Sequence, residues 1–216
     1  MIKISKIRKK NYSMIGIIDY GLGNIGAISN IYNKLKVKNI IARNSEDLNK
    51  SEKLILPGVG AYDSAMNLLN KSNLILDIKK EIFENQKKIL GICVGMQIFA
   101  KNSAEGNKPG LNWFEAEVKK INSSGHKTLR LPHMGWNSIN IIKEDSLFKD
   151  LKDDKYFYFC HSYYFECKNK TNILAETTYG HQFSSVVKND NLYGIQFHPE
   201  KSHDNGIRIL SNFSKL

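Results

Sequence analysis

The sequence predicts a single α/β domain with a mixed, mostly parallel central sheet flanked by helices. Two observations predict this class. Short apolar runs alternate with segments of helical periodicity through residues 14–93, and strand-like segments joined by short turns dominate the remainder. Strands that alternate with helices form βαβ units and a parallel sheet, whereas short turns join antiparallel strands. A chain of 216 residues with 41% hydrophobic content is long enough to bury one such core without disulfide bonds.

The first half holds the expected parallel strands and their helices. Short apolar runs bounded by turn residues indicate buried strands, and apolar residues at i, i+3 and i+4 spacing indicate helices. We expect strands at 14–18, 39–42, 54–56 and 89–93, and helices at 25–35, 61–69 and 74–83.

The second half is richer in strands. No repeat, low-complexity segment or linker divides the chain, so we expect one domain over residues 14–216, preceded by a basic extension, residues 1–13. We expect strands at 115–121, 136–142, 156–160, 172–177, 182–188 and 192–197, and helices at 147–151 and 206–213.

The charge of the chain is unusual, because 32 Lys and Arg against 21 Asp and Glu give a formal net charge of +11. A basic chain points to nucleic acid or to an anionic ligand. Five of these cations lie in residues 1–13, which hold no acidic residue, so the rest of the chain carries +6. Only four of the 32 basic residues are arginine, the residue that favours bidentate contacts to phosphates and bases. We therefore expect no nucleic acid partner.

The sequence also disfavours three other classes of protein: membrane proteins, disulfide-stabilised proteins and metal-binding proteins. No apolar run approaches the roughly 18 residues of a membrane helix, so we expect no membrane association. Three cysteines are too few for a disulfide framework and favour a reducing compartment, the cytoplasm. The histidines show no metal-ligand spacing with the cysteines, so we expect no metal. The histidines are His126, His133, His161, His181, His198 and His203.

A glycine-rich turn follows the first expected strand. Gly21-Leu-Gly-Asn-Ile-Gly26 matches the dinucleotide-binding pattern G-x-G-x-x-G. The acidic residue that should end the second strand is missing, and Arg43 stands there instead, where it can meet a 2′-phosphate. The alternative is a turn whose glycines let strand and helix pack closely. Both interpretations stay open.

The strongest chemical signal is a cysteine between two glycines. In Gly91-Ile-Cys93-Val94-Gly95 a hydrophobic strand runs into a sharp turn and then a helix. This is the thiol version of a nucleophile elbow, in which the glycines permit the turn that presents the nucleophile. The helix N-terminus favours a thiolate, and the N–H of Val94 can face an oxyanion. The alternative is a buried structural cysteine.

A cysteine nucleophile needs a base, and the base needs a group that orients it. His198 ends an apolar strand in Gln-Phe-His-Pro-Glu, and Glu200 follows two residues later. In an extended chain residues i and i+2 lie on the same side, so Glu200 can orient His198. The rival pair, Cys160 and His161, is less suited, because adjacent strand residues point to opposite faces.

A second oxyanion donor is expected in Pro57-Gly58-Val59-Gly60, after another strand. Glycines at a strand end let backbone N–H groups turn into a cavity. In isolation a plain Pro-Gly turn is the preferred interpretation of this segment, and the other motifs are what favour an oxyanion donor here.

Together these residues resemble the class I (triad) glutamine amidotransferases over nearly the whole chain from residue 14. Further motifs resemble those of the glutaminase subunits of imidazole glycerol phosphate synthases. These are Ile-Asp-Tyr-Gly-Leu-Gly-Asn at 18–24, Pro-Gly-Val-Gly at 57–60, Pro-His-Met-Gly-Trp-Asn at 132–137, Tyr-Phe-Cys-His-Ser-Tyr-Tyr at 158–164 and His-Pro-Glu-Lys-Ser at 198–202.

The resemblance implies a glutaminase that needs no cofactor or metal. Cys93, His198 and Glu200 match the triad, and Gly58, Val59, Gly60 and Val94 match the oxyanion hole. Gln97, with the backbone of Ser162 and Tyr163, matches the glutamine site. The ammonia passes to a (β/α)₈-barrel cyclase subunit in a heterodimer. The positions that match the partner interface are Asn24, Trp136, Tyr158 and Lys201.

Two departures leave alternatives open. Residues 1–13 precede the family pattern, and Gly110-Leu-Asn-Trp113 replaces an expected Gly-Leu-Gly stretch. The Asn112-Trp113 segment and residues 201–203 admit a paralogous glutaminase that supplies ammonia for amidination of a nucleotide-linked sugar in surface polysaccharide synthesis. A free-standing cysteine hydrolase and a dinucleotide-binding module are the remaining alternatives.

Overall fold

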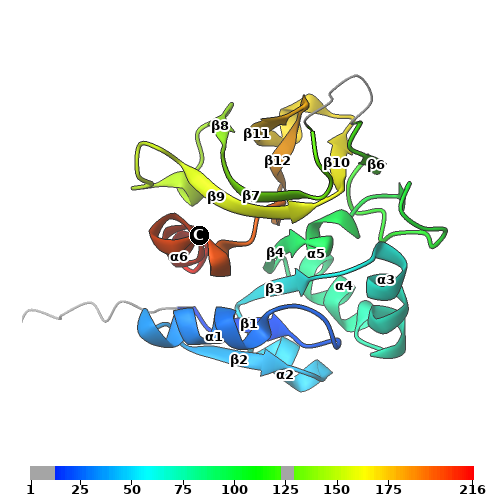
Figure 1. Ribbon diagram of the computed structural model, residues 1–216. Helices are drawn as coiled ribbons and strands as arrows, with labels where there is room; N and C mark the ends of the chain where they lie inside the picture. The colour runs from blue at the N-terminus through cyan, green and yellow to red at the C-terminus, as the bar shows by residue number, and fades with distance from the viewer. Residues whose placement is uncertain (1–12, 123–128) are drawn as a thin grey trace, which may run out of the picture.

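A computed structural model of the protein describes residues 13–122 and 129–216. Its centre is one large mixed sheet with the strand order β2-β1-β3-β4-β13-β12-β10-β6-β5. Strand β11 joins this sheet by pairing with β12, and β8 pairs with β11. Helices cover the parallel part, and a two-stranded ribbon, β7–β9, runs between helix α6 and strands β11 and β12 (Figure 1). The predicted fold class is confirmed. Of the expected extension, all residues but Ser13 lie outside the described residues.

The parallel half of the sheet is its most buried part. Every residue of β1 and β3 is buried, which explains why these strands read as continuous apolar runs instead of alternating ones. Its strands are β2 (Asn39–Ala42), β1 (Ile15–Ile18), β3 (Lys53–Gly58), β4 (Lys88–Cys93) and β13 (Leu192–Ile195).

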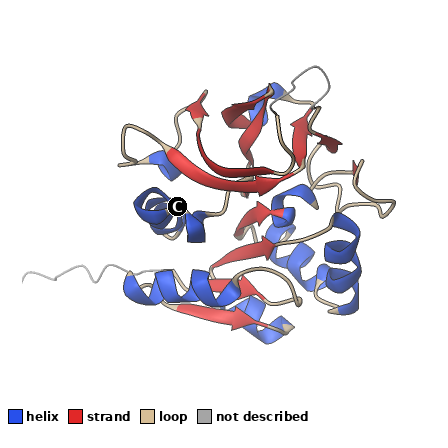
Figure 2. Ribbon diagram, viewed as in Figure 1, coloured by secondary structure: helices blue, strands red, loops and turns tan. Residues whose placement is uncertain are grey.

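Helices pack on both faces of these strands (Figure 2). On one face Tyr32 of α1 donates its hydroxyl hydrogen to the Leu210 carbonyl of α6 at 3.1 Å. The other face carries α2 and α4, which contact each other, and α3 contacts α5. The helices are α1 (Ile25–Lys34), α2 (Ser45–Lys50), α3 (Tyr62–Lys71), α4 (Ile75–Phe83), α5 (Val94–Gln97) and α6 (His203–Phe213). No helix in the described part of the chain has the length and apolar character needed to cross a membrane.

The antiparallel half continues from β13. Its strands are β12 (His181–Asn189), β10 (Tyr163–Cys167), β6 (Ala116–Lys120), β11 (Ile173–Tyr179) and β8 (Asn140–Ile141), with β5 (Asn102–Ser103) parallel to β6 at the edge. The ribbon pairs β7 (His133–Ser138) with β9 (Tyr156–His161). Its register places His133 opposite His161. Phe157 of the ribbon stacks on buried Phe197 at 4.0 Å between ring centroids, which fixes the ribbon against the segment that follows β13.

Several helices and strands of the structure differ from those expected from the sequence. The strand expected at 136–142 is two strands, β7 and β8. The helix expected at 147–151 is only the short 3-10 turn η1 (Ser146–Phe148), because the chain leaves helical geometry at Lys149. The strand expected at 192–197 ends at Ile195. Helix α2 was not expected, although Asn44 caps it by accepting the Asp47 N–H at 2.9 Å. Strands β5 and β10 were also not expected.

Candidate active site

Cys93 lies at the end of β4 in a conformation that non-glycine residues rarely adopt, with φ 54° and ψ −113°. The turn is possible because its flanking glycines allow backbone atoms to meet. A Cβ on Gly95 would overlap the carbonyl oxygen of Leu56, and one on Gly91 would lie 2.7 Å from the Gly95 carbonyl oxygen. Strain of this kind persists where the surrounding structure enforces it, often at functional sites. The expected elbow is therefore present in the backbone.

The segment after β3 lies beside this elbow. The β3–β4 register pairs Gly58 with Cys93, and a Cβ on Gly58 would lie 2.5 Å from the Gly95 nitrogen. Gly60 has φ +92°, which favours glycine. Val59 and Gly60 line the same pocket as Cys93, so backbone groups of this segment border the space in front of the sulfur.

His198 and Glu200 lie on the chain that follows β13, the parallel neighbour of β4. His198 Nδ1 is 3.0 Å from Glu200 Oε1, and the two side chains are only 4% and 2% exposed. The predicted contact is present, but the reason given for it was wrong. His198 does not end a strand. It caps the 3-10 turn η3 (Pro199–Lys201), and this turn brings Glu200 back under the imidazole.

The backbone around His198 is also fixed. Its N–H donates to the Tyr158 carbonyl at 2.9 Å, and its carbonyl accepts the Ser202 hydroxyl at 2.5 Å. Burial by itself lowers the pKa of His198, but the charge of Cys93, a hydrogen bond to Cys93 and then the interactions with Glu200 raise it to about 10. The interactions with Cys93 and Glu200 therefore favour the protonated imidazole.

These groups share one pocket. Its lining combines the Cys93 thiol, the His198 imidazole, backbone of the 57–60 segment and the Glu105 carboxylate. The lining residues are Val59, Gly60, Cys93, Val94, Gln97, Glu105, Cys160, His161, Ser162, Tyr163, His198 and Lys201.

Comparison with known proteins identifies the architecture. Residues 16–216 match the family model described as Glutamine amidotransferase class-I. The chain belongs to the class-I glutamine amidotransferase family. Two curated relatives are named imidazole glycerol phosphate synthase subunit HisH. One, from Bdellovibrio bacteriovorus, is 47% identical, and one, from Leptospira borgpetersenii, is 46% identical; each match covers 94% of this chain and 100% of the relative.

Solved structures agree with the fold of this amidotransferase. A structure titled glutamine amidotransferase has a TM-score of 0.71 at 18% identity, covering 94% of this chain and 99% of that one. PurLQS from Thermotoga maritima has a TM-score of 0.63 at 15% identity, covering 94% and 97%. At these identities the likeness concerns the fold alone.

One residue that lines the amidotransferase pocket, Glu105, was not singled out from the sequence, and another, His161, was considered only as part of the rival pair with Cys160. Glu105 Oε2 accepts the Tyr62 N–H at 3.0 Å. Burial raises the pKa of the Glu105 carboxyl, and the charge of Asp63 adds to this rise, although the hydrogen bond from Tyr62 acts in the opposite direction. His161, which the sequence left undecided, is buried and borders the pocket. A glutamate in an irregular segment after β5 carries no local pattern, so only the fold brings Glu105 to the site.

Gln97 lines the pocket, and two hydrogen bonds within the protein hold its side chain in place. Its Nε2 donates to the Tyr163 carbonyl at 2.9 Å and contacts Gln196 Oε1 at 3.0 Å. Both N–H groups are therefore used within the protein, and only Oε1 of Gln97 is left to meet a ligand. The Ser162 carbonyl likewise accepts the Ile121 N–H at 2.9 Å.

A neutral histidine pair lies behind the pocket. His161 Nδ1 donates to the Tyr163 carbonyl at 2.8 Å, because a carbonyl can only accept. His161 Nε2 therefore accepts from His133 Nδ1 at 3.0 Å, and His133 Nε2 accepts from the Asn137 amide at 3.2 Å. Burial lowers the pKa of His133 to about 4 and, with a smaller contribution from neighbouring histidines, that of His161 to about 3. Both rings are neutral at physiological pH.

Of the four expected partner-interface residues, only Lys201 borders the pocket. Its ammonium lies over the Tyr158 ring, 5.4 Å from the centroid. Trp136, which is 47% exposed, stacks on His203 on the same side of the ribbon, and its ring centroid is 6.3 Å from that of Tyr158. Asn24 lies apart from the pocket lining, at the start of α1.

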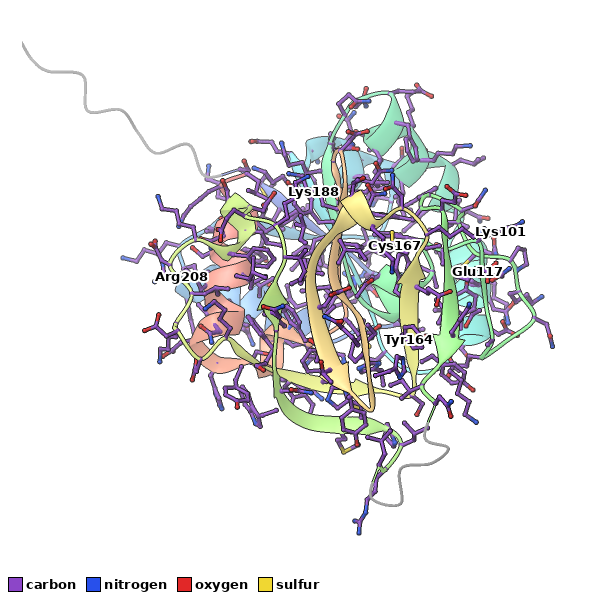
Figure 3. The ribbon with its side chains drawn as sticks, turned by 90° about the horizontal axis from the view of Figure 1, so that it is seen from above. Lys101, Glu117, Tyr164, Cys167, Lys188 and Arg208 are labelled. Atoms are coloured by element: carbon purple, nitrogen blue, oxygen red, sulfur yellow. The ribbon has the colours of Figure 1, made fainter. Side chains whose placement is uncertain are left out.

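The remaining sequence motifs have structural partners. Gly23 approaches Pro57 so closely that a Cβ would lie 2.6 Å from its side chain, and Arg43 pairs with Asp19 at 2.8 Å. These contacts favour close packing over a dinucleotide site. Cys167, labelled in Figure 3, lies on β10, and its thiol donates to the Asn169 carbonyl at 3.3 Å. Among the described residues no three His, Cys, Asp or Glu side chains gather to hold a metal, and His126 lies outside those residues.

The elbow geometry yields a first prediction. We expect Gly95→Ala to lower the free energy of unfolding by about 1–3 kcal/mol, because the new Cβ overlaps the Leu56 carbonyl. Gly26→Ala in α1 is the matched control: a Cβ there meets nothing within 4 Å, and alanine favours the helix by up to about 1 kcal/mol. Urea unfolding of both variants measures the difference, and equal stabilities would contradict the close approach at Gly95.

The neutral histidine pair yields a second prediction. The pKa values of His133 and His161 are lowered in the folded chain, so their stabilising effect is complete above the unfolded value of about 6.5 and is lost as the pH falls below it. Each ring contributes a slope of up to about 1.4 kcal/mol per pH unit between about pH 6 and 4.5. We expect His161→Gln to make this acid loss of stability shallower in urea titrations. The same slope in both proteins would show that the pair does not bind protons on unfolding.

Proposed function

We propose that this chain is the glutaminase subunit of an imidazole glycerol phosphate synthase, in which it hydrolyses glutamine and passes ammonia to a cyclase subunit. The observation that carries the proposal is the approach of His198, held by Glu200, to Cys93 on a glycine-flanked elbow. The identity of 46–47% with two HisH relatives along their whole length supports the choice of synthase.

The first half of the proposed reaction forms a thioester. The Cys93 sulfur attacks the side-chain amide carbon of glutamine, and the carbonyl oxygen becomes an oxyanion. The N–H of Val94 has no acceptor inside its short helix and, with an N–H from Gly58–Gly60, can stabilise that charge. His198 gives its proton to the amide nitrogen, the C–N bond breaks, and ammonia leaves.

The second half releases glutamate. His198, now neutral, takes a proton from water while the water oxygen attacks the thioester carbon. The C–S bond then breaks with its electron pair on sulfur, which restores the pair formed by the Cys93 thiolate and the His198 imidazolium. Glu200 keeps the imidazole in place through both halves and stabilises its positive charge.

The pocket also suits the amino-acid end of glutamine. Glu105 supplies a carboxylate, and Gln97 has only an acceptor oxygen free, so both match an α-ammonium group. The carbonyls of Ser162 and Tyr163 already have protein donors. We therefore expect the backbone of these two residues to meet the substrate carboxylate through N–H groups.

We propose that the barrel-shaped cyclase docks on the exposed side of the β7–β9 ribbon. Met134, Trp136 and Tyr156 are exposed there at 61%, 47% and 46%, and large exposed aromatic side chains are typical interface anchors. Lys201 stands where this face meets the pocket. Ammonia released at Cys93 would leave on this side, and Asn24 remains a proposed contact at the start of α1.

Two further assignments belong to this proposal. We take residues 14–216 as the catalytic unit, and the family match to residues 16–216 supports that boundary. We also place the protein in the cytoplasm, since its three cysteines are free thiols and the nucleophile must stay reduced. The alternative of a sugar-amidinating paralogue is not favoured, because the relatives at 47% and 46% identity carry the histidine-pathway name.

The third prediction tests the nucleophile. We expect Cys93→Ala to lower glutamine hydrolysis by about 10⁴-fold or more, since removing a nucleophile disables the whole triad. Glutamate formation is measured with the cyclase subunit of a histidine-pathway synthase present. Cys167→Ala, which removes a buried thiol outside the pocket, is the control and keeps activity.

The same assay separates the alternatives. Low glutaminase activity alone, stimulated when the cyclase and its phosphoribosyl aminoimidazole carboxamide substrate are added, supports the proposal. Full turnover without a partner would favour a free-standing hydrolase, and stimulation only with a sugar-amidinating partner would reassign the acceptor.

A further inference from the structure

Gln196 has no role in the mechanism above, yet its side chain touches the nucleophile. The parallel register pairs Ile195 of β13 with Ile92 of β4, so Gln196 comes beside Cys93. Gln196 is fully buried, and its Nε2 lies 3.7 Å from the Cys93 sulfur. We propose that Gln196 is a catalytic residue whose amide N–H donates to the Cys93 sulfur and stabilises the thiolate. The inference rests on the proposed glutaminase function.

The orientation of the Gln196 amide follows from its neighbours. The Tyr163 carbonyl can only accept, so the group of Gln97 that faces it at 2.9 Å is the NH₂. The second hydrogen of that NH₂ points to Gln196 at 3.0 Å, and this requires an oxygen there. The NH₂ of Gln196 must then face the sulfur. A reversed amide would place two oxygens, or two NH₂ groups, against each other.

The same chain of hydrogen bonds continues away from the sulfur. The Tyr163 carbonyl also accepts from His161, whose other nitrogen accepts from His133. Asn137 donates to His133 and to the Thr178 carbonyl. Every link has one possible donor direction, so the ribbon strand β7 helps to hold the Tyr163 carbonyl, the carbonyl holds Gln97, and Gln97 holds Gln196.

A donor at this position assists the reaction wherever the sulfur carries charge. In the resting enzyme it favours the thiolate beside the His198 imidazolium. In the second half the C–S bond breaks and the electron pair returns to sulfur, and the Gln196 N–H again meets a developing negative charge. A hydrogen bond to a charged group in a buried site is stronger than one between neutral groups.

A pH-dependent measurement must account for the other groups near the sulfur. These groups are unchanged in variants of Gln196, so they affect all the proteins compared in the same way. The titratable groups that line the pocket or interact with Cys93 are Tyr20, Glu105, Cys160, His161, Tyr163, His198 and Lys201.

The test measures alkylation of Cys93 by iodoacetamide between about pH 6 and 10, with the modified peptide quantified by mass spectrometry, and glutamine turnover in the complex with the cyclase. Gln196→Met keeps the side-chain length and removes the donor. Gln196→Glu keeps an acceptor toward Gln97 but turns a carboxylate to the sulfur. Gln182→Met, at an exposed position on β12, is the matched control.

We expect Gln196→Met to slow alkylation at pH 7 about tenfold, to move the pH profile about one unit upward and to leave its high-pH plateau intact. Gln196→Glu slows alkylation further, and Gln182→Met behaves as the parent protein. Turnover falls in the same order. A purely structural role would lower the melting temperature and the plateau without moving the profile, and that result overturns the proposal.

An unmoved profile in folded Gln196→Met also overturns it. Should that variant fail to fold, Gln196→Ala, which removes the donor without adding a charge, decides the question by the same profile. Alkylation needs no glutamine, so a shifted profile in a protein without glutaminase activity would refute the proposed function and leave the role of Gln196 standing.

Discussion

The close approach of two backbone segments at Gly95 is the constraint on which the active site depends. The first turn of α5 lies against the Leu56 carbonyl, and Gly58 lies against the Gly95 nitrogen, with no room for a side chain at either glycine. This contact holds Cys93 in its positive-φ conformation and keeps the 57–60 segment beside the sulfur. The proposed nucleophile and one wall of the pocket are thus placed by backbone packing between β3 and β4. Such placement needs no reorganisation when charge develops during the reaction.

The opposite wall of the pocket, around Gln97 and Tyr163, depends on a chain of hydrogen bonds in which every donor and acceptor is fixed. Three buried histidines lie close together, yet their environments drive the pKa in opposite directions. His198 faces Cys93 and the Glu200 carboxylate, and its interactions with both raise its pKa, whereas burial keeps His133 and His161 neutral. A second cation near His198 would compete for the thiolate. The neutral pair instead acts as a rigid spacer between the exposed ribbon and the Tyr163 carbonyl. The surface proposed for the partner and the proposed nucleophile are therefore joined by a few short contacts.

Much of this architecture could be predicted from local patterns. Apolar strands that alternate with helices gave the parallel half correctly, and glycines around Cys93 indicated the elbow. The contact between His198 and Glu200 was expected for the wrong reason, since a 3-10 turn replaces the extended strand. The places of Glu105 and Gln196 at the site could not be found in this way, and His161 appeared only in the rival pair with Cys160. Their positions depend on strand register and on an irregular segment, and a buried glutamine after a strand looks like any other polar residue.

The central claim is that Cys93 attacks the amide carbon of glutamine within this pocket. The most direct measurement is covalent labelling by a glutamine analogue that carries a diazoketone in place of the side-chain amide, followed by peptide mass spectrometry. The account predicts one adduct per chain, located on Cys93, formed more slowly when glutamine is present and absent in the Cys93→Ala protein. Labelling of Cys160 or Cys167 instead, or labelling of Cys93 that glutamine does not slow, would contradict it.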